Sequence, residues 1–132
     1  MRNLYWMKMM AGNKNINKHY EVINKMNKND YYVLNWFDKA KEDYFKLDGE
    51  QIVFVDKALS RIKIMGMEAG QQLYGKLHNC RKLKNRKKKG LRIVFKEGNF
   101  FKDIDIIDII VIGKRTDDEV YLEAEKRLNN EI

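Results

Sequence analysis

From Gly75 onward, apolar and polar residues alternate with a period of two, and this pattern constrains the fold more than any other feature of the chain. The alternation predicts strands over residues 77–86, 91–96 and 100–112. Only residues 87–90 and 97–99 separate these strands, and linkers this short join antiparallel neighbours. The second half of the chain is therefore predicted to form an antiparallel meander.

Helical spacing of apolar residues occurs on both sides of the meander. An aromatic and β-branched run at 31–37 predicts a first strand, and helical patterns over 37–47 and 52–62 predict a two-helix hairpin. Thr116 and Glu119 have the spacing of a capping box at the start of a C-terminal helix. We expect an α+β domain in which the strand and the hairpin pack on the antiparallel meander, with the helices against one face of a mostly antiparallel sheet.

The N-terminal residues 1–30 are rich in Asn, Lys and Met and show no sustained period. We expect a poorly ordered extension over 1–30 and a folded domain over 31–132. A folded helix from Lys18 to Met26 is the alternative. Met26 could also be the start of the protein, because the recognisable pattern lies after it.

Charge and cysteine content restrict the partners and the compartment. The 132 residues carry a net charge of +8, which favours a polyanion or an acidic protein as partner. Cys80 is the only cysteine, so neither an intramolecular disulfide nor a cysteine-based metal site can form. The apolar run 104–112 is far shorter than a membrane span, and the first ten residues do not resemble a signal peptide. We expect a cytoplasmic protein.

Basic side chains gather on one face of the predicted meander. Between Glu68 and Glu97 there is no acidic residue, although like charges on adjacent strands destabilise a sheet. We therefore predict that this face binds an anionic ligand. The alternative is a solvated face, or a strand edge protected by lysines. The cations of this face and of its loop are Lys82, Lys84, Arg86, Lys87, Lys88, Lys89, Arg92 and Lys96.

Four separated motifs resemble the RelE branch of the RelE/ParE toxin superfamily. They are residues 75–86 (GKLHNCRKLKNR), 90–95 (GLRIVF), 112–115 (IGKR) and 119–121 (EVY). The resemblance extends over roughly residues 31–128 and includes the order of the elements. It does not include the N-terminal extension.

This resemblance implies the toxin of a type II toxin–antitoxin system. Such a toxin is a ribonuclease that cuts mRNA, at the ribosome in the best-known members, and a cognate antitoxin neutralises it. The resemblance implies neither a metal nor a small-molecule cofactor. By matching motif, Lys84 would be the general base, and Lys82 and Arg92 would hold the phosphate. Arg115 would protonate or stabilise the leaving oxygen, and Tyr121 would stack on a base of the RNA. Arg86, Lys87, Lys88, Lys89 and Lys96 would contact RNA.

Two other functions remain open from the sequence. A ParE-like toxin shares the fold but poisons DNA gyrase and lacks this basic set. A non-catalytic module would hold RNA or an acidic antitoxin without cutting it, because phosphate-binding and phosphate-cleaving clusters use the same side chains. We assign no catalytic role to His19, His78 or Cys80, and no metal to the aspartates of the third meander strand.

Overall fold

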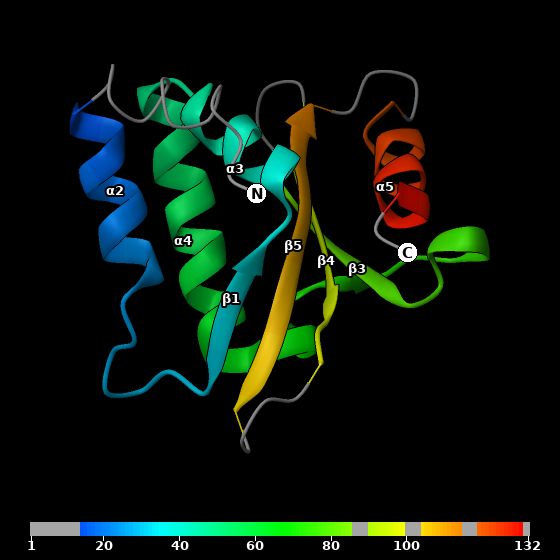
Figure 1. Ribbon diagram of the computed structural model, residues 1–132, viewed down its shortest axis with the longest axis horizontal. Helices are drawn as coiled ribbons and strands as arrows, with labels where there is room; N and C mark the ends of the chain where they lie inside the picture. Colours follow the sequence, from blue (N-terminus) through cyan, green and yellow to red (C-terminus); the bar gives the residue numbers. More distant parts are fainter. Residues whose placement is uncertain (1–13, 86–89, 100–103, 115–118, 131–132) are drawn as a thin grey trace.

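The computed structural model describes residues 14–85, 90–99, 104–114 and 119–130 (Figure 1). None of the helices in these ranges is both long and apolar enough to cross a membrane. In chain order the elements are α2 (Lys14–Asn24), β1 (Tyr32–Trp36), α3 (Asp38–Phe45), α4 (Gly49–Met65), the 3-10 helix η1 (Gly66–Ala69), β2 (Gln71–Gln72), the 3-10 helix η2 (Gly75–Leu77), β3 (Cys80–Lys84), β4 (Leu91–Glu97), β5 (Asp105–Lys114) and α5 (Glu119–Asn130).

The strands form one sheet in the order β1-β5-β4-β3-β2. The predicted α+β fold and its antiparallel meander β3-β4-β5 are confirmed. β1 lies parallel to β5 at one edge, and the two-residue strand β2, which the sequence did not predict, pairs with β3 at the other. β3 begins at Cys80, three residues later than expected, because Leu77 belongs to η2.

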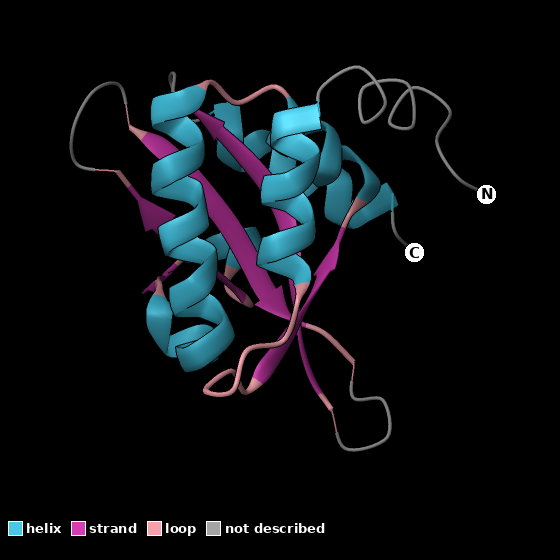
Figure 2. Ribbon diagram, turned by 90° about the vertical axis from the view of Figure 1, so that its left-hand side faces the viewer, coloured by secondary structure: helices cyan, strands magenta, loops and turns pink. Residues whose placement is uncertain are grey.

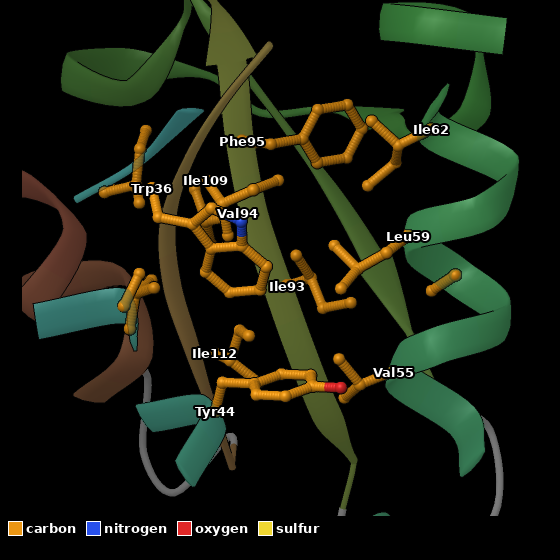
Figure 3. Close-up of a cluster of buried hydrophobic side chains, with 14 of the residues drawn as sticks. Trp36, Tyr44, Val55, Leu59, Ile62, Ile93, Val94, Phe95, Ile109 and Ile112 are labelled. Atoms are coloured by element: carbon orange, nitrogen blue, oxygen red, sulfur yellow. The ribbon is translucent and has the colours of Figure 1, made fainter. Parts of the chain in front are cut away.

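The core lies between the sheet and α4 (Figure 3). Ile93 and Phe95 of β4 point toward Leu59 and Ile62 of α4, and all four side chains are almost completely buried. A bulge between Val94 and Phe95 shifts the pairing with β5 by one residue, so that Ile93 lies opposite Ile112 and Phe95 lies opposite Ile109. We call this surface of the sheet the α4 face.

The opposite surface, which we call the α5 face, is covered in part by α5. The expectation that the helices pack against one face is therefore wrong: Figure 2 shows α2 and α4 in front of the sheet, while α5 packs against β5 and β4 from the other side. The physical reason is that β5 is apolar on both faces, and that Val94 of β4 adds a buried apolar side chain on the α5 face. Val94 and Val111, which pair on the α5 face, are as buried as the core and need the cover of Val120 and Ala124.

A buried arginine fixes α5 in this position. Arg127 Nη1 donates to Asp43 Oδ2 of α3 at 2.7 Å and to the carbonyl oxygen of Ile110 at 2.8 Å. Its Nε donates to Glu123 Oε2 at 2.7 Å, and Asp43 also accepts from the backbone of Ile112. One side chain thus joins α3, β5 and α5.

The N-terminal helix α2 corrects the expectation of a poorly ordered segment for residues 14–24. Ile23 is buried against α4, and the Tyr20 ring lies 5.2–5.7 Å from the rings of Trp36, Tyr44 and Phe45. Trp36 Nε1 also donates to Asn24 Oδ1 at 2.7 Å. The sequence pattern was misleading because only a few apolar residues, set among exposed Lys and Asn, make these contacts. The boundary between extension and domain at residue 30 stays a prediction.

Lys63 attaches the end of α2 to the rest of the molecule. Only 2% of its side chain is exposed, and Nζ donates to the carbonyl oxygens of Ile23 at 2.7 Å and Lys25 at 2.6 Å. The carboxylate of Asp30 lies 3.2 Å away and balances the charge. The ammonium therefore satisfies carbonyl groups that the helix end leaves unpaired.

We expect Lys63→Met to lower the free energy of unfolding by about 3–5 kcal/mol, because it leaves a buried carboxylate and two carbonyl groups without their partner. Urea denaturation followed by circular dichroism measures the change. Lys57→Met, at an exposed position of the same helix, is the control and should shift stability by about 0.5 kcal/mol at most. Equal unfolding midpoints for the two variants would contradict this account of Lys63.

Candidate active site

The register between β3 and β4 brings the predicted cations together on the α5 face. Lys84 lies directly opposite Arg92, and Lys82 lies opposite Val94. Side chains that are opposite in an antiparallel pair point to the same side of the sheet. The prediction that Arg92 stands beside the row of Lys82 and Lys84 is thus confirmed, and we call these three residues the basic row.

Arg92 is the most buried member of the basic row, with an exposed fraction of 8%. Its Nε and Nη1 are buried and have no hydrogen-bond partner among the described residues. Its guanidinium lies against Gly90, whose φ of +58° favours glycine, and a Cβ at that position would overlap Arg92 Nη1. Buried donors without acceptors are unfavourable, so the guanidinium is ready to bind an anion.

Lys82 and Lys84 differ in their surroundings. Lys82 is half-buried, and its Nζ lies 5.4 Å from the centroid of the Tyr121 ring, in the range of a cation–π contact. Lys84 is exposed at the end of β3. Lys82 is therefore held in place by α5, whereas the Lys84 amine is open to solvent.

Tyr121 takes part in the site in a way that the sequence did not indicate. Its ring is half-buried, and its hydroxyl is buried without a hydrogen-bond partner in the described part of the chain. Lys82 already occupies a position over the ring. Tyr121 joins the basic row, but the structure shows it in contact with a lysine rather than as a freely exposed stacking surface.

Lys96 lies on the same face as the basic row, opposite Cys80, but has a different environment. Its Nζ donates to Asp108 Oδ2 at 3.0 Å, and Asp108 Oδ1 accepts from Asn35 Nδ2 at 2.8 Å. The charge that was expected to contact RNA is thus matched by a carboxylate. The pairing of Lys96 with Asp108 across β4 and β5 explains this, and the alternation of β5 was the sequence signal that could have revealed it.

Five of the predicted site residues lie outside the described residues. These are Arg86, Lys87, Lys88, Lys89 and Arg115. Arg115 directly follows the end of β5 in the chain. Their roles stay predictions.

The residues that we set aside do not join the basic row. His78 Nδ1 donates to the carbonyl oxygen of Gly75 at 3.1 Å, and His19 Nδ1 lies 2.9 Å from Asp56 Oδ2 on the α4 side. Within the described ranges, no group of three or more His, Cys, Asp or Glu side chains has an arrangement suited to a metal ion. Cys80 is 1% exposed, and burial raises the pKa of its thiol, an effect that the nearby charge of Lys96 opposes.

Comparison with known proteins shows a structural similarity but no match in sequence. No protein-family model matches the sequence, and no curated protein matches it. Among solved structures, the chain is similar to the toxin RelE of E. coli, in a free-state structure of a mutant with two arginines replaced by alanine. The sequence identity is 28%, the TM-score is 0.57, and the match covers 75% of this chain and 98% of that one.

We expect the Cys80 thiol to react slowly with a disulfide reagent in the folded protein at neutral pH. Burial restricts access to the sulfur, and the raised pKa lowers the fraction of reactive thiolate. The rate of colour development with dithiobis-nitrobenzoate, measured in buffer and in denaturant, tests this. Similar rates in both conditions would show that the thiol is accessible and would make Cys80 a candidate nucleophile.

Proposed function

We propose that this chain, which has the RelE-like toxin fold, is the toxin of a type II toxin–antitoxin system and acts as an endoribonuclease on mRNA, at the ribosome. The observation that carries the proposal is the buried Arg92 guanidinium, with donors free among the described residues and with Lys82 and Lys84 on the same face of the sheet. Three cations placed side by side suit a phosphate group.

The proposed reaction is an in-line attack within the RNA. The 2′-oxygen forms a bond to the adjacent phosphorus while the bond to the 5′-oxygen of the next nucleotide breaks. A base removes the proton of the 2′-hydroxyl, and an acid returns a proton to the departing oxygen. The products are a 2′,3′-cyclic phosphate and a 5′-hydroxyl end. This sequence of bond changes needs no metal ion, provided that cations stabilise the charge of the transition state.

Each member of the basic row has a role that its environment supports. Lys84, exposed and opposite Arg92, is proposed as the base. Arg92 and Lys82 would bind the phosphate oxygens, and the fixed guanidinium would cost little reorganisation as negative charge develops. Tyr121 would orient the RNA through its contact with Lys82. Arg115 stays our proposal for the group that protonates or stabilises the leaving oxygen.

We propose that the cations outside the basic row bind neighbouring phosphates of the RNA. Arg86, Lys87, Lys88 and Lys89 would add to the attraction for RNA. Lys96 would contribute only by exchanging Asp108 for a phosphate. An antitoxin would neutralise the enzyme by laying an acidic segment over the basic row, because a segment that folds on binding can cover an extended charged surface.

We expect Lys84→Ala to slow RNA cleavage by about 10²- to 10⁴-fold, which is the usual effect of losing a general base. Induced expression in bacteria, with transcript ends mapped by primer extension, compares the variant with the intact chain. New ends with 5′-hydroxyl groups should form only with the intact chain. Cleavage of purified RNA or of programmed ribosomes in EDTA tests the absence of a metal requirement.

Lys57→Ala is the matched control, because Lys57 is an exposed lysine of α4 on the other face of the sheet. It should cleave as the intact chain does. Cleavage by Lys84→Ala at the same rate would remove Lys84 from the mechanism. Growth arrest without cleavage would favour a gyrase-poisoning toxin, and binding without cleavage or arrest would favour a non-catalytic module.

A further inference from the structure

Tyr74 is the most exposed large apolar residue of the described chain, with an exposed fraction of 81%. Its backbone is nevertheless held in a defined turn. The carbonyl oxygen of Tyr74 accepts from Leu77 N at 3.3 Å, that of Gly75 accepts from His78 N at 3.1 Å, and Gly75 has a φ of +66°. An exposed aromatic ring on a fixed turn is a feature of binding surfaces, because it gains contact area at a small entropic cost.

A groove adjoins this ring and leads to the candidate active site. It encloses about 360 Å³ between η2 and α5, and Tyr74 and Tyr121 both line it. Tyr121 therefore connects the groove with the basic row, since Lys82 lies over its ring. The other lining residues are Leu73, Lys76, Leu77, Leu122 and Glu125.

We propose that this groove binds a nucleobase of the single-stranded substrate, adjacent to the cleaved phosphate, and that the base stacks on Tyr74. The inference rests on the proposed function, because the basic row must hold the RNA backbone. Tyr121 was the expected stacking residue, but Lys82 lies over its ring and its hydroxyl is buried. Tyr74 is the neighbouring aromatic ring that is open to a ligand.

The chemistry of the lining fits a base better than a phosphate. Leu77 and Leu122 provide apolar surface, and 62% of Leu122 is exposed without a ligand. Glu125 would repel a phosphate but can accept a hydrogen bond from the amino group of a base. Lys76 adds a cation at the groove. Aromatic rings beside cations are the usual means of binding single-stranded nucleic acid.

The test measures binding of a short 2′-O-methyl RNA, which lacks the attacking hydroxyl and cannot be cleaved. We expect Tyr74→Ala to weaken binding by about tenfold, within the range for the loss of one stacked base. Tyr74→Phe should bind as the intact chain does, because it keeps the ring. Tyr31→Ala is the matched control, since Tyr31 is 71% exposed and precedes β1 at the opposite edge of the sheet.

Two further measurements distinguish a contact with a base from a contact with a phosphate. The dependence of affinity on salt should be the same for Tyr74→Ala and the intact chain, because no phosphate contact is lost. If 2-aminopurine replaces a base of the 2′-O-methyl RNA, the intact chain should quench its fluorescence on binding. Tyr74→Ala should not quench it. Unchanged affinity and quenching in Tyr74→Ala would overturn the proposal and leave a protein partner as the occupant of the groove.

Failure of this inference can be separated from failure of the proposed function. If the intact chain cleaves RNA while Tyr74→Ala binds and cleaves equally well, only the base site is wrong. If the intact chain binds RNA through Tyr74 but never cleaves it, the base site stands and the ribonuclease activity is wrong. Thermal unfolding of Tyr74→Ala should match the intact chain, because the ring is exposed.

Discussion

The candidate active site depends on the register of β4 between its two neighbours. Ile93 and Phe95 must face α4, because their burial supplies the core between helix and sheet. A strand cannot slip by one residue without moving all of its side chains to the opposite face. The packing that buries Ile93 therefore also directs Arg92 to the α5 face, next to Lys84. The burial of the hydrophobic core thus offsets the repulsion between the charges that it brings together.

Within the ranges that the structure describes, two other buried cations have partners that Arg92 lacks. Lys63 and Arg127 are both buried, and each is matched by a carboxylate and by backbone carbonyl groups. Arg92 is buried to a similar degree, yet two of its nitrogen atoms lack partners among the described residues. Lys63 and Arg127, which support the fold, are thus both paired. A guanidinium with two nitrogen atoms unpartnered among the described residues is consistent with a ligand that arrives from outside.

Sequence periodicity predicted the elements well but not how they meet. Alternation correctly placed Lys82, Lys84 and Arg92 on one face, because a strand leaves only two directions for its side chains. It could not show that α5 covers part of that face, since both sides of β5 are apolar and either can be the core. A helix near α2 was only the alternative expectation, because its contacts depend on Tyr20 and Ile23 meeting residues far along the chain. The pairing of Lys96 with Asp108 and the exposure of Tyr74 likewise follow from tertiary contacts.

Gly90 illustrates how a residue without a side chain can take on the importance of a functional group. Its backbone has a positive φ, and the space that a Cβ would fill is taken by the Arg92 guanidinium. An alanine there would push that guanidinium out of place while leaving the packing against α4 untouched. If cells that survive expression of a harmful protein were selected, substitutions at Gly90 would accordingly appear among the inactivating ones, as substitutions of the charged residues would. A glycine would then map as part of the active centre.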